Sequence, residues 1–313
     1  MSYPALRRGT ALLLLLLAAW PTMTVAATAT STSPEPAVAH APSKHPTHHA
    51  RHLRRPPGGV VYARNAILLD PLTDSVLYQK DAETPAPIAS LTKLMTALVF
   101  LEQNPDLRRT AEVTPAELHG AGHSQLRPHE QVPLGDLLHM SLMCSDNAAT
   151  RVLARESGLG SDEFVDRMNR KARELGLAST HYVEVTGLDE RNVSTAADIA
   201  QLLRVAADNT LIRDITTTPS YQFTAERSMR HVHHVRHQIA NTNRLLKSHY
   251  CEVNCGKTGF IMEAGYCVAT WVRARGHDLI AVVLGAPTNA TRFADVVRLV
   301  QYTTPTTVSS SPQ

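Results

Sequence analysis

Ser90 and Lys93 are the first residues whose types and spacing suggest covalent chemistry. They lie three positions apart, so their side chains share one face of a helix and can meet. The lysine stands within the apolar run IASLTKLMTALVFLE, whose spacing predicts a buried helix that begins near Ser90. Burial lowers the pKa of a lysine because it disfavours the charged amine. A neutral amine can take the serine proton, and the pair therefore predicts a serine nucleophile with a lysine base.

Two further motifs strengthen this hypothesis, because a Ser-x-x-Lys pair alone occurs often by chance. Ser145-Asp146-Asn147 follows the helical run GDLLHMSLMC, and Lys257-Thr258-Gly259 opens a predicted strand hairpin. These three motifs form the signature of penicillin-binding proteins and class A β-lactamases. All three occur here in the order typical of those enzymes.

The chain resembles the low-molecular-mass penicillin-binding proteins, which are serine D-Ala-D-Ala peptidases of bacterial peptidoglycan. The resemblance covers about 60–303 and is strongest to the D-alanyl-D-alanine endopeptidase branch, known as penicillin-binding protein seven. Besides the motifs, it rests on the segments TGLDERNVSTAADIAQLL, NTNRLL, KTGFIMEAGYCVA and RFADVVRL. It implies a β-lactamase/transpeptidase-like α/β fold, with an antiparallel sheet flanked by helices plus an all-helical subregion. It implies no cofactor and no metal.

The resemblance also implies three catalytic residues. Ser90 would be the acylated nucleophile and Lys93 its general base. Ser145 would pass a proton toward the leaving amine. A nearby cation disfavours a second positive charge, so we also expect Lys257 to lower the pKa of Lys93.

Substrate binding falls, by the same resemblance, to residues of the second and third motifs. Asn147 would hold a peptide group of the substrate, and Lys257 and Thr258 would bind its terminal carboxylate. Gly259 belongs to the same substrate-binding set. The backbone N–H groups of the nucleophile and of Phe260 would form the oxyanion hole. The expected partners are peptidoglycan peptides, with β-lactam antibiotics as covalent inhibitors.

Three alternative functions remain open on the sequence. A D-Ala-D-Ala carboxypeptidase would use the same acyl-enzyme chemistry as an endopeptidase. A class A β-lactamase also needs a carboxylate that activates the deacylating water, and Glu184 follows the Ser-Asp-Asn motif at a suitable distance. Its context, however, resembles a peptidase segment more than a lactamase loop. A penicillin-binding receptor without turnover is the third alternative, and the intact Ser90–Lys93–Ser145 set argues against it.

The elements that must position these motifs form one mixed α/β domain, predicted at 60–305. The runs 60–70 and 75–81 predict an N-terminal hairpin, and helical patterns fill about 110–210. HDLIAVVLGA predicts a strand near the C-terminus, and RFADVVRLVQYT predicts a closing helix. Strands at both ends with helices between them favour a sheet built from both ends of the chain. Thr195 and Asp198 predict a capping box for one of the helices.

The N-terminus is typical of an exported protein. Arg7 and Arg8 precede the apolar run 11–20, and the small residues before Ala26 suit a signal peptidase. We therefore expect a signal peptide over 1–26, a periplasmic protein and no stable membrane anchor after cleavage. The segment 27–59 predicts a disordered Pro/His-rich tether, and 306–313 predicts a disordered tail.

The charge distribution argues against a nucleic-acid partner. Of 31 basic and 28 acidic residues, six basic ones and one acid lie within 1–59, so the rest carries a formal charge of −2. A slightly acidic body lacks the basic surface that nucleic acid requires.

The cysteines and histidines outside the motifs predict little chemistry. The four histidines between 231 and 237 mostly alternate, which favours one face of a strand over a metal site. An exported protein can form disulfides, and at most one bridge is expected, between Cys251 and Cys255. That bridge requires a bend at CEVNC, because in one strand the two residues would lie about 13 Å apart.

Overall fold

The computed structural model describes residues 61–228 and 231–302. The predicted signal peptide, tether and tail lie outside these residues, as do the outermost positions of the predicted domain 60–305. Within the described ranges, no helix is both long and apolar enough to span a lipid bilayer.

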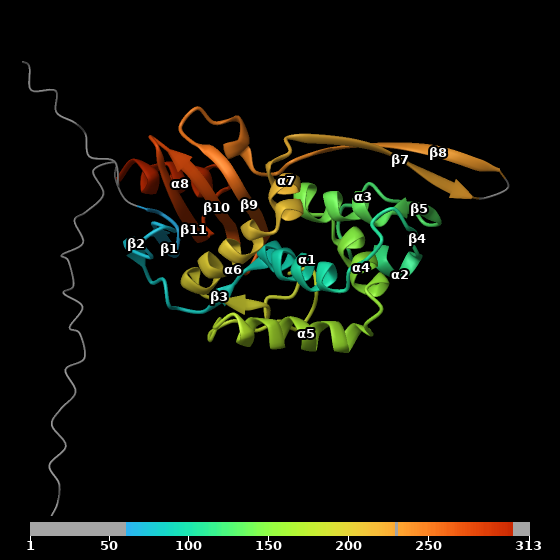
Figure 1. The fold of residues 1–313 in the computed structure, drawn as a ribbon, viewed down its shortest axis with the longest axis horizontal. Helices are drawn as coiled ribbons and strands as arrows, with labels where there is room; N and C mark the ends of the chain where they lie inside the picture. Colours follow the sequence, from blue (N-terminus) through green and yellow to red (C-terminus); the bar gives the residue numbers. More distant parts are fainter. Residues whose placement is uncertain (1–60, 229–230, 303–313) are drawn as a thin grey trace, which may run out of the picture. The chain divides into compact units, whose positions relative to one another are not determined.

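A five-stranded antiparallel sheet joins the two ends of the described chain, as the sequence predicted. Its first hairpin closes at Asp70, whose side chain accepts a hydrogen bond from the Leu72 N–H at 2.8 Å. In spatial order the strands are β2 (Val76–Lys80), β1 (Asn65–Leu69), β11 (His277–Ala286), β10 (Gly265–Ala274) and β9 (Glu252–Ile261) (Figure 1).

Helices pack on both faces of this sheet, which explains why its central strands are almost wholly apolar. α8 (Asn289–Tyr302) contacts β10 and β11 on one face, and α6 (Ala196–Asp208) contacts the same strands on the other (Figure 1). Side chains of successive residues in a strand point to opposite faces of the sheet. Val282 therefore belongs to the large core shared with the helices, and Val283 to the smaller core under α8.

α1 (Thr92–Glu102) is buried along most of its length and packs against α4 (Asn147–Glu156), α5 (Ser161–Glu174) and α6. α2 (Pro115–Leu118) and α3 (Leu134–His139) pack on α4, and α7 (Thr210–Thr217) packs on β9 and α6. Three short helical segments complete the set: the 3₁₀ turns η1 (Ala89–Leu91) and η3 (Arg244–Lys247), and the π-helical turn η2 (Met140–Cys144). This arrangement confirms the predicted α/β fold class. The expected subregion is not all-helical, however, because paired strands at 110–112 and 130–133 lie among its helices.

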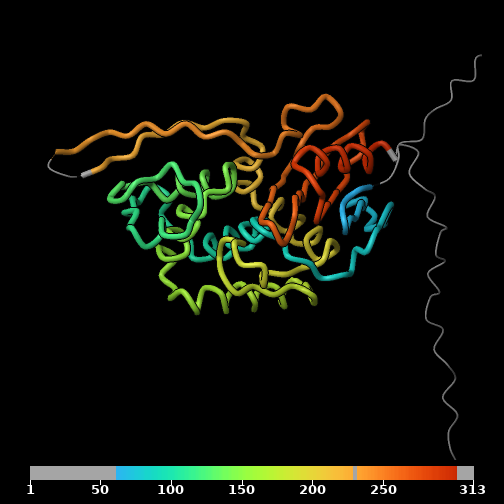
Figure 2. Tube along the Cα trace, turned by 180° about the vertical axis from the view of Figure 1, so that it is seen from behind, coloured from blue at the N-terminus to red at the C-terminus, as the bar shows by residue number. Residues whose placement is uncertain are grey.

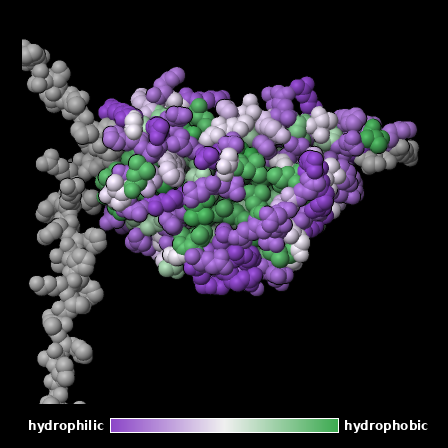
Figure 3. Space-filling model, viewed as in Figure 1, coloured by the Kyte–Doolittle hydropathy of each residue, from purple (hydrophilic) through white to green (hydrophobic). Residues whose placement is uncertain are grey.

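A second antiparallel sheet carries a long hairpin (Figure 2). Its strands are β4 (Thr110–Glu112), β5 (Glu130–Pro133), β7 (Ser220–Ser228) and β8 (Val232–Ala240), and a further pair links β3 (Ala86–Pro87) to β6 (Val193–Ser194). The hairpin is largely polar on the face shown in Figure 3. The predicted strand is confirmed as β8 for His233, His234 and His237, whereas His231 precedes it. One of its histidines, His237, is buried and lies 3.0 Å from the Glu130 carboxylate.

Two local expectations need correction. All four cysteines are free. Cys255 enters the large core and its sulfur accepts from Thr216, whereas Cys251 packs against the smaller core, so the two thiols face different sides of the sheet. The capping box of α6 is only half formed. The Thr195 hydroxyl caps Asp198, but the Asp198 carboxylate instead accepts from the Ser179 N–H at 2.9 Å.

Candidate active site

Ser90 lies in η1, the single turn that leads into α1 and packs against β9. Buried Ile88 and Leu91 anchor this turn on either side of the serine. Ala89 adopts a positive φ of 48°, which is unusual for a residue with a Cβ and turns the chain sharply just before the serine. The Ser90 side chain remains partly accessible as a result.

Lys93, one turn further on, has three oxygen neighbours. Its Nζ lies 2.9 Å from Ser90 Oγ, 2.6 Å from Asn147 Oδ1 and 2.6 Å from the carbonyl oxygen of Thr186. An amide oxygen and a carbonyl oxygen can only accept hydrogen bonds. A neutral amine that donates its two N–H bonds to them therefore directs its lone pair at the Ser90 hydroxyl.

Burial gives Lys93 this neutral form near neutral pH. The side chain has no exposed surface, and loss of solvation lowers its pKa from 10.5 to about 7. The carboxylates of Glu184 and Asp146 act in the opposite direction, and Arg151 adds a small lowering. Burial is thus the main cause of the lowered Lys93 pKa, and the effect expected of the Lys257 charge stays a prediction.

Lys257 lies in the middle of β9 and is buried too, with 1% of its surface exposed. Its Nζ donates to Ser145 Oγ and to the Thr258 carbonyl oxygen, both at 2.9 Å. Burial lowers the pKa of Lys257 well below its usual value, and the positive charge of Lys93 lowers it further. The two buried amines therefore repel each other, which disfavours the state in which both are charged.

Ser145 owes its position to a break in the helices. The π-helical turn η2 ends there, and Ser145 adopts the left-handed conformation with φ 64°. The next residue, Asp146, caps α4 by accepting from the Ala149 N–H at 2.9 Å. Its other oxygen accepts from the Ser124 hydroxyl at 2.7 Å, which ties the motif to a preceding loop. The serine hydroxyl is thereby held between the helical region and β9.

The end of the third motif packs directly against the serine turn. A Cβ added to Gly259 would lie 3.0 Å from the backbone nitrogen of Ser90, so the absence of a side chain lets β9 approach the serine turn closely. Thr258 pairs with the Thr242 hydroxyl at 2.6 Å. Phe260 is 44% exposed and stacks on Tyr266.

The loop 184–192 contacts the lysine site through the Thr186 carbonyl, and Glu184 organises this loop. One oxygen of this carboxylate accepts from the Thr186 N–H at 2.7 Å and from the Thr186 hydroxyl at 2.6 Å. The other accepts from the Gly187 N–H and, at 2.9 Å, from the Asn192 side chain. Both oxygens are thus engaged within the loop, and the loop presents the Thr186 carbonyl to Lys93.

The structure brings the predicted residues together in two hydrogen-bonded groups. Ser90, Lys93 and Asn147 form one group, and Ser145, Lys257 and Thr258 form the other. Gly259 abuts the first group, and Phe260 lies at the exposed edge beside it. Asn147 differs from the expectation in one respect. Both ends of its amide are bound internally, since its nitrogen donates to the Ala121 carbonyl at 2.8 Å.

Sequence reasoning missed four contributors to this geometry. The Thr186 carbonyl and the Glu184 carboxylate shape the lysine site, and Thr242 supports Thr258. Arg292 is buried on α8 and donates to the Gly259 carbonyl at 2.9 Å, which holds the end of β9 in place. Thr242 and Arg292 lie within the quoted segments NTNRLL and RFADVVRL, so a signal was present although no role could be read from it.

Comparisons with known proteins agree with this geometry. The family model described as D-alanyl-D-alanine carboxypeptidase, peptidase S11, matches residues 52–288. A D-alanyl-D-alanine endopeptidase from Pseudomonas aeruginosa is 36% identical over 238 residues, which cover 75% of each chain.

Two solved structures share the fold at 27% identity. The Streptomyces K15 DD-transpeptidase has a TM-score of 0.73 and covers 78% of this chain and 97% of its own. Penicillin-binding protein D2 from Listeria monocytogenes, solved in its ampicillin-bound form, has a TM-score of 0.65 and covers 79% and 99%. The chain belongs to the serine D-alanyl-D-alanine peptidases of family S11.

Proposed function

We propose that this protein is a D-alanyl-D-alanine endopeptidase that cleaves peptidoglycan cross-links through an acyl-enzyme on Ser90. The observation that carries the proposal is the environment of Lys93. Its buried amine has two oxygens that only accept and one hydroxyl, so the neutral form is directed at the nucleophile. β-Lactams would acylate the same serine, in keeping with the ampicillin-bound relative.

Acylation begins when the Lys93 lone pair takes the Ser90 proton. Ser90 Oγ then attacks the carbonyl carbon of the D-Ala residue, and the C–N bond to the next residue breaks after a tetrahedral intermediate forms. The backbone N–H groups of Ser90 and Phe260 would hold the oxygen of that intermediate, where negative charge develops. The close approach of Gly259 to the Ser90 nitrogen supports this oxyanion hole, because it brings the backbone of β9 next to the backbone of the serine turn.

The second group of residues would serve the leaving amine and the carboxylate beside it. Ser145 would donate its hydroxyl proton to the amine nitrogen and recover a proton from the Lys257 amine, 2.9 Å away. A substrate carboxylate that binds at Lys257 and Thr258 raises the pKa of that amine again, since opposite charges favour the ionised form. Water would then attack the ester, with its proton passing through Ser145 to the Lys257 amine. Lys93 would return its proton to Ser90 Oγ as the ester bond breaks, which restores the free enzyme.

The endopeptidase assignment rests on the likeness to the Pseudomonas relative, and carboxypeptidase is the alternative because the family description names that activity. Both reactions form the same acyl-enzyme. They differ only in whether the leaving group is a free terminal D-Ala or the cross-linking residue of a second stem peptide.

Glu184 disfavours the β-lactamase alternative. Its two oxygens accept four hydrogen bonds from its own loop, so the carboxylate is not directed at a deacylating water. Glu184 acts here as a positioning residue for the Thr186 carbonyl. We also propose that 1–26 is removed on export and that the enzyme works in the periplasm, on the basis of the charge and apolar pattern of that segment.

Cleavage of purified cross-linked peptidoglycan tests the assignment directly. We expect cross-linked stem peptides to fall and uncross-linked ones to rise in proportion, as measured by chromatography and mass spectrometry of the released fragments. Ser90→Ala is the inactive control. Loss of one terminal D-Ala with the cross-links left intact would instead establish the carboxypeptidase.

Ser90→Ala should abolish covalent labelling by a fluorescent penicillin, measured on a denaturing gel. Replacement of a small polar residue at a helix start costs only about 1 kcal/mol, so the variant should stay folded. Ser161→Ala, which alters an exposed serine in the first turn of α5, should label normally. A labelled Ser90→Ala protein would place the nucleophile elsewhere.

The acylation rate should fall as pH drops below about 7, because the Lys93 amine gains its proton there. Each further pH unit below the pKa should reduce the rate about tenfold, since only the neutral fraction reacts. Stopped-flow acylation by nitrocefin measures this limb. Lys93→Arg should be inactive at every pH, because a guanidinium stays charged. If Lys93→Arg kept the parental acylation rate and the parental pH profile, another base would have to activate Ser90.

Glu184→Gln should shift this acid limb to lower pH. The Glu184 carboxylate raises the Lys93 pKa more than any other charged neighbour, and the variant removes that charge. Glu190→Gln, which neutralises an exposed carboxylate in the same loop, serves as control. A slower deacylation step with an unchanged acid limb would contradict the positioning role and favour a lactamase-like water.

Gly187→Ala should strongly reduce acylation, because the added Cβ would lie 1.9 Å from the Ala89 carbonyl oxygen. The collision must displace either the loop or the turn that carries Ser90. Gly158→Ala is a matched control, since Gly158 has a φ of +85° against +83° for Gly187 but open space around it. Both variants bear about 1–2 kcal/mol of backbone strain, so equal acylation rates would show that the close packing is not needed.

A further inference from the structure

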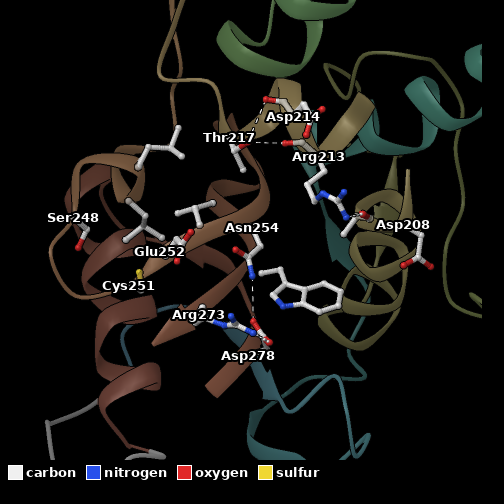
Figure 4. Close-up of a pocket in the computed structure, with 15 residues that line it drawn as sticks. Asp208, Arg213, Asp214, Thr217, Ser248, Cys251, Glu252, Asn254, Arg273 and Asp278 are labelled. Atoms are coloured by element: carbon white, nitrogen blue, oxygen red, sulfur yellow. Dashed lines mark hydrogen bonds and ion pairs between the residues drawn. The ribbon is translucent and has the colours of Figure 1, made fainter. Parts of the chain in front are cut away.

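A second cavity, of about 820 Å³, lies at the far end of β9 and β10 from the nucleophile. Its walls come from the first residues of β9, the end of β10, the start of β11, helices α6 and α7, and the segment around η3 (Figure 4). It shares no residue with the active site. Asn254 precedes Lys257 by three positions, so the two sites are separated by about 10 Å along one strand.

The cavity contains an aromatic surface. Trp271, on β10, is half-buried, and it packs against the large core while also lining the cavity. Its indole nitrogen has no hydrogen-bond partner among the described residues, although it is shielded from solvent. A partly open indole suits ligands that combine apolar and polar faces. Trp271 is also the only tryptophan of the chain apart from Trp20.

Polar groups with unused hydrogen-bonding capacity surround this surface. The Arg213 guanidinium makes one weak bond, at 3.4 Å, to the Ala207 carbonyl. The carboxylates of Asp208 and Asp214 accept no hydrogen bond within the described chain. Figure 4 shows these side chains from α6 and α7 on one side of Asn254.

The opposite side of the cavity is already fixed by internal bonds. Asp278 accepts from the Asn254 amide at 3.1 Å and from the Arg273 guanidinium at 2.8 Å (Figure 4). The cavity thus combines a rigid polar wall, a half-buried indole and a wall of uncommitted donors and acceptors. Polar groups of this kind can fix the orientation of a small ligand, and the indole gives it an apolar surface to pack on.

The charges narrow the class of ligand. Four carboxylates and two guanidinium groups line the cavity, which gives it a surplus of two negative charges. A phosphorylated or carboxylate-rich ligand would be repelled. A neutral sugar offers C–H faces to the indole and hydroxyl and amide groups that both donate and accept hydrogen bonds.

We propose that this cavity binds the glycan strand of peptidoglycan through its neutral N-acetylated hexosamine units. The inference rests on the proposed function, because only an enzyme of peptidoglycan would meet this polymer as the backbone of its substrate. Stem peptides branch from the glycan, so a glycan site on β9 holds the polymer while its peptide reaches Ser90.

Intrinsic fluorescence of the full chain with Trp20→Phe tests the proposal, because its tryptophan emission comes from Trp271 alone. Oligomers of N-acetylglucosamine are the probe, since they carry no stem peptide and need no catalysis. We expect a saturable change in emission, with binding weakened at least tenfold by Arg213→Ala. Arg170→Ala, at a solvent-facing position of α5 outside the cavity, should bind as well as the parent.

A second measurement separates this inference from the proposed function. Arg213→Ala should cleave intact peptidoglycan several-fold more slowly than the parent, yet react with fluorescent penicillin at the parental rate. Oligomer binding should persist in Ser90→Ala, so a failed labelling experiment leaves the glycan site standing. An emission change caused by an oligolysine peptide but not by the sugar would overturn the proposal in favour of a cationic ligand. If the sugar causes no emission change at millimolar concentration while penicillin labelling is normal, the glycan proposal is overturned and the proposed function is not.

Discussion

The buried amine of Lys93 imposes the constraint on which the rest of the structure depends. It needs two partners that accept hydrogen bonds and cannot donate them, so that its lone pair faces Ser90. One partner comes from the first residue of α4 and the other from the backbone of Thr186. Three segments distant in sequence must therefore meet at one atom, and the helices around α1 are arranged to bring them there.

This arrangement carries a free-energy cost that the fold must offset. A lysine whose pKa falls from 10.5 to about 7 on folding costs about 5 kcal/mol of stability at neutral pH. The sign follows from the protons: between those pH values the unfolded chain holds a proton that the folded chain lacks, so the cost shrinks as pH rises toward 10.5. Ala89 and Ser145 add strain through their positive φ angles. Such strain persists only where the surrounding packing holds the backbone in place. Here it lies at Ser145 and directly before Ser90.

The sequence predicted the side chains of the site better than the contacts between them. Lys93 contacts Ser90 and Lys257 contacts Ser145, each pair as its motifs and the family resemblance implied, because side-chain type and spacing are visible in the chain. The Thr186 carbonyl was not predictable, since every residue has one and only the fold selects which reaches the lysine. The same limit explains Cys251 and Cys255. They enter opposite cores because a register shift at Asn254 places Val253 with Cys251 on the side of the smaller core and Cys255 on the side of the large one. The antiparallel sheet was predictable from both ends of the chain because strands such as β11 are strongly apolar.

β9 connects the chemistry to the proposed glycan site. Its middle holds Lys257 and packs on the Ser90 turn, and its first residues form a wall of the second cavity. A strand is a stiff spacer of about 3.3 Å per residue, so the two sites keep a fixed separation. A cross-linked polymer held at one end of this strand would present its peptide at the other at high effective concentration. Preference for the polymer over a free peptide would then come from the cavity at the start of β9. The catalytic motifs alone would not give this preference, because small β-lactams also react there.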